Sequence, residues 1–194
     1  DAIVALPFIE DLGSGALDES AFSFYLDQDA QYLSSYSKAL ARLVSLAPST
    51  EEQLHWAESA YGCLAEEAEL HRTWLQGRVS SAPSRVTSAY TDFLIRCTHT
   101  DDYVVAAASV LPCYWLYAEV GLYLAEHDSE DHPYHAWLKV YGGEDFLGSV
   151  RRSLEIVEQA LARADEETRS RAERAYISAC IHEVDFFDQA DRRF

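Results

Sequence analysis

The sequence of 194 residues lacks several features that identify particular classes of protein. It contains no Asn, and therefore no glycosylation sequon, and its four cysteines include no CxxC pair. Scattered cysteines are typical of reduced thiols and argue against a disulfide framework or a zinc knuckle. No apolar run approaches the ~18 residues of a membrane span, and the first residues, DAIVALPF, do not resemble a secretory signal. These absences lead us to expect a cytoplasmic protein.

Positive charge is also scarce. The chain has 15 basic and 33 acidic residues, which gives a formal net charge of −18. A surface of this charge repels nucleic-acid phosphates and anionic lipids, so we expect neither a nucleic acid nor a membrane as a partner. The length and the 48% hydrophobic content fit one globular domain over residues 1–194.

Alternating strand-like runs are absent, and apolar residues recur instead at spacings of three and four, as in amphipathic helices. Asp18 is a candidate N-cap, and Ser49 and Glu52 form a candidate capping box for a helix that runs to about Gln76. A loop rich in Gly, Ser and Pro follows over residues 77–83. The pattern predicts an all-α bundle of about seven to eight helices, seven of which lie near residues 19–46, 50–76, 84–97, 101–126, 135–141, 144–164 and 165–190.

Asp29 lies in the centre of an apolar stripe on the first of these helices. The polar residues Asp27, Gln31 and Ser34 fall largely on other faces. Burying an unpaired carboxylate costs several kcal/mol, so such a group is paired, protonated or satisfied by a ligand. A structural Asp that ties two helices together is the alternative. The remaining members of the stripe are Phe22, Tyr25, Leu26, Tyr32, Leu33, Tyr36, Leu40 and Leu43.

Glu183 repeats this anomaly on the last predicted helix. Its stripe also contains Ala172, Ala175, Tyr176, Ala179, Cys180, Phe186, Phe187 and Ala190. If Glu183 and Asp29 meet inside the bundle, their surroundings can shift their pKa values as acid–base catalysis requires.

The segment ASVLPCYWLYAEVGLYL, residues 108–124, is apolar on almost every side and predicts the central helix. Pro112 removes an amide donor, so we expect a kink and a widened space beside it. Cys113 follows directly, and Tyr117 lies one turn later on the same face. Buried cysteines usually only pack, so the residues alone leave Cys113 open as either a core residue or a nucleophile.

Other chemistry has weaker support in the sequence. The Glu-x-x-His spacing typical of di-iron bundles occurs only at Glu52 and His55, and capping already accounts for Glu52. The histidines of HDSEDHPYH show no regular ligand spacing. The glycines of LGSGAL follow no strand and indicate a turn, not a phosphate-binding loop.

Taken in order, several motifs resemble the TenA proteins, also called thiaminase II, of the haem-oxygenase-like helical fold. They are PFIEDLGSGAL, FSFYLDQDAQYL, YTDFL, LPCYWLY, WLKVYGGEDF and HEVDFF, and the likeness covers nearly the whole chain. The resemblance implies an enzyme that hydrolyses 4-amino-5-aminomethyl-2-methylpyrimidine to the hydroxymethyl pyrimidine and can also cleave thiamin. It further implies a homotetramer that needs no metal or organic cofactor.

The resemblance also implies roles for individual residues. The family's nucleophile corresponds to Cys113, its pyrimidine-binding aspartate to Asp29 and its acid–base glutamate to Glu183. The tyrosines of its pocket correspond to Tyr32, Tyr90, Tyr117 and Tyr141. Three positions depart from the family pattern: Leu6 replaces a usual His, Ala30 a common aromatic and Phe187 a common Trp.

Two other functions compatible with this fold remain as alternatives. One is a non-catalytic pyrimidine-binding or regulatory protein that keeps the pocket. The other is a metal-dependent oxidase resembling the PqqC-like proteins, which are not expected to carry the cysteine helix.

Overall fold

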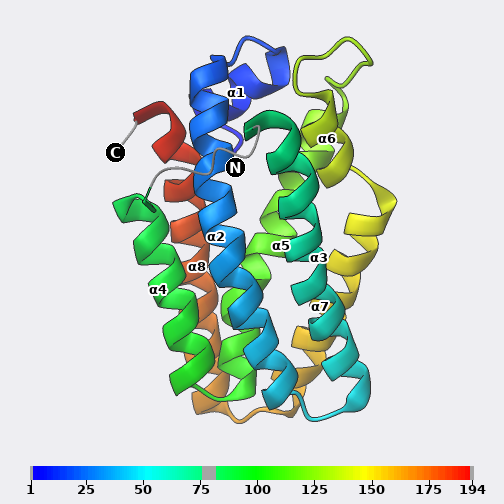
Figure 1. Cartoon of the computed structure of the whole chain (residues 1–194). Coiled ribbons are helices and arrows are strands. Elements are labelled where there is room, and N and C mark those ends of the chain that lie inside the picture. Colours follow the sequence, from blue (N-terminus) through cyan, green and yellow to red (C-terminus); the bar gives the residue numbers. More distant parts are fainter. Residues whose placement is uncertain (1, 76–81, 193–194) are drawn as a thin grey trace.

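A computed structural model describes residues 2–75 and 82–192 of the chain. Over these residues the fold consists of helices without strands, as the sequence predicts (Figure 1). The eight helices are α1 (Pro7–Ser14), α2 (Glu19–Leu46), α3 (Thr50–Leu75), α4 (Arg85–Thr100), α5 (Tyr103–Ala125), α6 (His135–Tyr141), α7 (Glu144–Arg163) and α8 (Glu166–Arg192).

Most helices begin and end within a few residues of the predicted boundaries, because capping residues near their ends set these boundaries. The Asp18 carboxylate accepts a 2.9 Å hydrogen bond from the Ser20 amide, and the Ser49 hydroxyl accepts one of 3.2 Å from the Glu52 amide. The predicted end of the second helix at Gln76, and the loop residues Gly77, Ser80 and Ser81, lie outside the described residues.

Helix α1 was not predicted. It has only eight residues, begins with Pro7 and ends before Gly15, whose φ of 74° lies in the left-handed region. A segment this short shows too few turns for a helical period to be recognised in its sequence. Of the two LGSGAL glycines, Gly15 forms a turn as expected, at the end of α1, whereas Gly13 lies inside the helix.

The arrangement of the long helices places α5 at the centre of the bundle. Helix α5 packs against α2, α4, α6, α7 and α8, while α3 covers α2 and reaches α7 (Figure 1). Helices α1 and α6 lie at the same end of the bundle (Figure 1). The enclosed position of most of α5 explains why its sequence is largely apolar, although Trp115, Leu122 and Tyr123 are exposed.

Helix α5 also corrects one expectation from the sequence. The sequence predicts no apolar run long enough to span a membrane, but the length and apolar composition of α5 meet the criteria for a membrane-crossing helix. However, 72% of the qualifying window is buried inside the protein. The central helix of a bundle meets the same criteria because its neighbours, rather than lipid, surround it.

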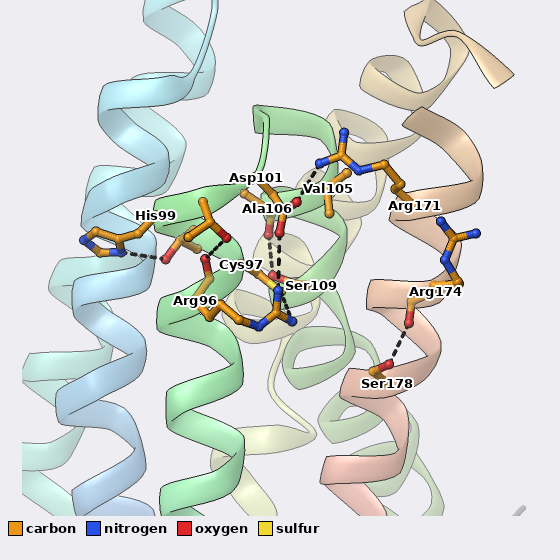
Figure 2. A network of polar contacts seen from close by, with 12 residues as sticks. Arg96, Cys97, His99, Asp101, Val105, Ala106, Ser109, Arg171, Arg174 and Ser178 are labelled. Atoms are coloured by element: carbon orange, nitrogen blue, oxygen red, sulfur yellow. Dashed lines mark hydrogen bonds and ion pairs between the residues drawn. The ribbon is translucent and has the colours of Figure 1, made fainter. Parts of the chain in front are cut away.

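Ion pairs join α8 to the α4–α5 connection at the opposite end of the bundle from α1. Arg171 donates hydrogen bonds of 2.5 Å to Asp101 and 2.8 Å to Asp102, and Arg96 lies 3.6 Å from Asp101 (Figure 2). Asp102 is also the N-cap of α5 and accepts a 3.1 Å bond from the Val105 amide. These contacts fix the start of the helix that carries Cys113.

The expectation that the polar residues of α2 lie away from its buried faces is wrong for Asp27. Asp27 is only 8% exposed, and neighbouring Gln28 is fully enclosed. The Gln28 side-chain oxygen accepts hydrogen bonds of 2.8 Å from the Ser84 amide and from the Thr87 hydroxyl. The start of α4 covers this part of α2, which the periodicity of α2 alone does not indicate.

Candidate active site

A cavity of about 1090 Å³ opens between α2, α3, α5, α6 and α7. This volume slightly exceeds the usual range of small-molecule sites, roughly 300–1,000 Å³. Five of the seven residues predicted for the site line it, namely Asp29, Tyr32, Cys113, Tyr117 and Tyr141. Glu183 and Tyr90 are not in the lining but are joined to each other behind it.

Helix α2 contributes two of these lining residues, one turn apart. Asp29 is 4% exposed and Tyr32 2% exposed, so the predicted inward stripe is confirmed here. The Tyr32 ring lies 5.3 Å from the Tyr36 ring and 5.0 Å from the Tyr90 ring. Its buried hydroxyl lies near the Cys113 thiol and the Tyr90 hydroxyl but makes no hydrogen bond of regular geometry with any described residue. A bound ligand can supply such a bond.

Glu183 is 1% exposed and accepts a 2.6 Å hydrogen bond from the Tyr90 hydroxyl. Burial raises the pKa of Glu183 to about 8, the hydrogen bond from Tyr90 opposes this rise, and the negative charge of Asp29 adds to it. Glu183 therefore holds a proton at neutral pH and can release it near its pKa. A group with this pKa is suited to general acid–base catalysis.

Cys113 lies on α5 directly after Pro112 in a helix that continues through the proline. Burial raises the pKa of its thiol well above the ordinary value, and the charge of Glu183 raises it further. The neighbouring Tyr32 hydroxyl partly offsets these effects. Cys113 is thus a thiol at neutral pH, and its use as a nucleophile requires a group that accepts its proton.

An aromatic wall encloses the part of the cavity next to Asp29. The Tyr117 and Tyr25 hydroxyls lie 3.0 Å apart, and the Tyr117 ring is 4.9 Å from the Tyr141 ring. Gly121 permits this arrangement, because a Cβ there would lie 2.4 Å from the Tyr141 carbonyl oxygen. The predicted stripe includes Tyr25, but the sequence did not indicate its contact with Tyr117 or the need for glycine at position 121.

The three departures from the family pattern lie outside the cavity lining. Ala30 is buried, and Leu6 precedes α1 as its N-cap residue. Phe187 packs behind the aromatic wall, with its ring 6.0 Å from Tyr25 and nearly parallel to it, and 5.0 Å from Tyr117. Position 187 can therefore affect the ligand only through the tyrosines in front of it.

The far end of the cavity, between α3 and α7, contains polar residues that the sequence did not single out. They include Ser59, Tyr114, Ser149 and Arg152, together with His55, which had been considered only as a metal ligand. A hydroxyl or imidazole in an amphipathic helix resembles any surface residue, so periodicity could not reveal them.

The candidate metal residues serve other contacts. The His55 ring bonds to Ser153 at 2.9 Å, and His132 donates from Nε2 to the Gly13 carbonyl at 3.2 Å. The Glu52 amide donates to the Ser49 hydroxyl, which is one half of the predicted capping box. The Glu52 carboxylate is buried, at 8% exposure, and its hydrogen bond with the Tyr103 hydroxyl helps to raise the pKa of Tyr103. Within residues 2–75 and 82–192, no group of three or more His, Cys, Asp or Glu side chains is placed to hold a metal ion.

Comparison with known proteins gives a consistent result. Residues 2–193 match the family described as TENA/THI-4/PQQC. The chain is 55% identical over 185 residues to the thiamine biosynthesis multifunctional protein ThiED of Corynebacterium glutamicum, covering 95% of this chain and 24% of that protein. It is 28% identical to the aminopyrimidine aminohydrolase of Bacillus subtilis, covering 96% of this chain and 82% of that enzyme. The chain spans about a quarter of the length of the two corynebacterial relatives that it matches.

Solved structures show the same fold. A TenA family transcription regulator from Silicibacter sp. superposes with a TM-score of 0.87 at 26% identity, covering 97% of this chain and 89% of that one. A TenA homologue from P. horikoshii gives a TM-score of 0.85 at 28% identity, with coverages of 98% and 91%.

Proposed function

The chain belongs to the TENA/THI-4/PQQC family, and from this premise we propose that it is an aminopyrimidine aminohydrolase of thiamin salvage. The proposed reaction replaces the amino group on the 5-methylene of 4-amino-5-aminomethyl-2-methylpyrimidine with a hydroxyl group and releases that nitrogen as ammonia; the 4-amino group stays on the ring. Thiamin, which carries the same pyrimidine, is a proposed second substrate. In both cases the enzyme would act as a hydrolase that cleaves a C–N bond.

One observation carries this proposal: Cys113 and Asp29 face one cavity, and Glu183 is close enough to both for their charges to interact. An aminopyrimidine has a flat ring with a donor and acceptor edge. The Asp29 carboxylate can accept from the amino group at that edge while tyrosine rings enclose the ring faces. This arrangement would hold a ring carbon in front of the Cys113 sulfur.

The protonation states support a stepwise reaction. Cys113 and Glu183 both hold protons at neutral pH. In the first step the Cys113 sulfur bonds to a ring carbon, and the thiol proton passes to a ring nitrogen. The electron-rich adduct then expels the amine: the C–N bond breaks, Glu183 gives its proton to the departing ammonia, and an exocyclic methylene remains.

Hydrolysis is completed by water. Water adds to the methylene carbon and gives a proton to the Glu183 carboxylate. The bond between sulfur and the ring carbon then breaks, and Cys113 regains its proton from the ring nitrogen. Glu183 thus acts first as an acid and then as a base, and its pKa near neutrality suits both roles.

The test is to incubate the purified protein with the aminomethylpyrimidine or with thiamin, in the presence of a metal chelator, and to measure the pyrimidine product and ammonia. The proposal predicts hydroxymethylpyrimidine from both substrates and ammonia from the first. Tight binding of the pyrimidine without any product would favour the regulatory alternative instead. Activity that disappears with the chelator and returns with a metal would favour the oxidase-like alternative.

A further inference from the structure

The far end of the cavity is larger than the proposed aminopyrimidine requires. The cavity extends from Asp29 on α2 to Ser149 and Arg152 on α7, past Ser59 and Gly62 on α3. Asp29 and the aromatic wall can bind a single small ring at one end of the cavity. The region between α3 and α7 is therefore available for another part of a ligand.

Two buried hydroxyls in this region make no hydrogen bond of regular geometry. Tyr114 is 7% exposed, and neither its hydroxyl nor the buried Ser59 hydroxyl forms such a bond with any described residue. The Ser59 and Tyr36 hydroxyls are near enough to Tyr114 to oppose the rise in its pKa that burial causes. Both residues line the cavity. Leaving a buried hydroxyl unsatisfied costs roughly 1–3 kcal/mol, so such groups are usually completed by water or by a ligand.

His55 is held beside them in a defined state. The Ser153 hydroxyl donates to the Ser149 carbonyl at 3.0 Å, so it accepts from His55 Nε2, which lies at 2.9 Å. Nδ1 of the same ring is then an acceptor. Burial and the charge of Arg152 lower the pKa of His55 to about 4, which keeps the ring neutral.

The surrounding charges leave this region without a strong preference for an ion. Arg152 pairs with Glu51 and with Glu155, so its charge is compensated. The other charged residues of the lining, Glu58, Lys139, Glu144 and Asp145, are exposed to solvent. The less exposed polar groups of this region include the Tyr114 and Ser59 hydroxyls and the neutral His55 imidazole, which suit a ligand group that both donates and accepts a hydrogen bond.

Gly62 gives this region its width. It lies inside α3, where glycine costs about 1 kcal/mol relative to alanine. A Cβ built at this position would have no heavy atom within 4 Å. Neither helix packing nor backbone conformation requires glycine here, whereas a side chain would occupy the cavity.

We propose that the α3–α7 end of the cavity is a second binding subsite that receives an uncharged, hydroxyl-bearing substituent on the leaving amine of the substrate. Tyr114 and Ser59 bind the hydroxyl, with His55 as a further acceptor, and Gly62 provides the room. This inference rests on the proposed function, because the pyrimidine must occupy the Asp29 end. It makes Tyr114 and Ser59 specificity-determining residues for the part of the substrate beyond the ring.

The test uses two synthetic derivatives of the aminomethylpyrimidine, one with a hydroxyacetyl group and one with a propionyl group on the methylene nitrogen. The two have the same number of non-hydrogen atoms and differ only by a hydroxyl in place of a methyl group. Calorimetry should show about tenfold tighter binding of the hydroxyacetyl derivative to the wild type. In a protein carrying Tyr114→Phe and Ser59→Ala this preference should fall below about twofold, since both partners of the hydroxyl are gone.

Tyr134→Phe is the matched control, because it removes a buried hydroxyl that donates to Leu17 at 2.6 Å outside the cavity. It should retain the tenfold preference. If the double variant does not fold, Ser59→Ala alone should still reduce the preference.

The unsubstituted aminomethylpyrimidine separates the two proposals. If it binds and is hydrolysed but the wild type shows no preference between the derivatives, or the preference survives in the double variant, the subsite is rejected and the proposed function stands. If the unsubstituted compound neither binds nor reacts, the proposed function is rejected and the subsite with it.

Discussion

The Tyr90 hydroxyl donates a 2.6 Å hydrogen bond to Glu183, and this bond joins α4 to α8 behind the cavity. A hydrogen bond to a carboxylate favours its charged form, whereas burial favours the neutral form. Burial is the larger effect at Glu183, and the resulting pKa is about 8. Tyr90 therefore moderates the proton affinity of the proposed acid–base group without lining the cavity.

Replacing Tyr90 with Phe removes this moderating bond. The pKa of Glu183 should rise, because the remaining effects, burial and the charge of Asp29, both raise it. The proposed mechanism needs protonated Glu183 to release ammonia, so the loss of kcat/KM at high pH should move to higher pH in Tyr90→Phe. The measurement is a pH profile of aminomethylpyrimidine hydrolysis. A residue with only a structural role would lower the activity at all pH values and leave the position of this limb unchanged.

Glu183 should also make stability depend on pH. Its pKa is about 8 in the folded protein and 4.5 in a model carboxyl group, so between these values the folded state holds a proton that the unfolded state has lost. Stability therefore falls as pH rises from about 4.5 to 8. The full effect is roughly 3–5 kcal/mol.

Glu183→Gln should remove this contribution, because the amide does not titrate and its oxygen can still accept from Tyr90. The free energy of unfolding of the variant minus that of the wild type should increase steadily between pH 5 and pH 8. Urea unfolding at several pH values measures this difference. A difference that is constant over the range would contradict the raised pKa of Glu183.

Cys113→Ser tests the proposed nucleophile. Serine is nearly isosteric but is a far weaker acid than cysteine, so ammonia release should fall by at least about 10³-fold while the protein stays folded. Binding of the hydroxymethylpyrimidine product should persist, because Asp29 and the tyrosines are unchanged. Cys97→Ser is the control: Cys97 is buried and outside the cavity lining, and its replacement should leave turnover intact. Undiminished turnover in Cys113→Ser would exclude Cys113 as the nucleophile.

The sequence allowed the helices and the two inward acids to be predicted for a physical reason. Helical periodicity alone determines which side of a helix faces inward, and it indicated Asp29 and Glu183 before any contact was known. It could not show that Tyr90 on another helix donates to Glu183. That contact depends on how α4 and α8 pack, which no pattern within one helix contains.

Other parts of the site depend on packing in the same way. His55 looked like half of a possible metal motif, yet its ring bonds to Ser153, a residue 98 positions away. Gly121 looked like an isolated glycine in an apolar helix, yet it lies against the backbone of Tyr141. In both cases the role of the residue comes from a neighbouring helix.

Gly62 and Gly121 are matched tests of this packing, because both lie inside long helices and differ only in what surrounds them. Gly62→Ala should stabilise the protein by about 0.5–1 kcal/mol, since a Cβ meets open space and alanine favours the helix. Gly121→Ala should destabilise it by about 1–3 kcal/mol, because a Cβ would lie 2.4 Å from the Tyr141 carbonyl oxygen and must push α6 away from α5. Urea denaturation of the two variants measures both values. Shifts of the same sign would contradict the cavity at Gly62 or the close contact at Gly121.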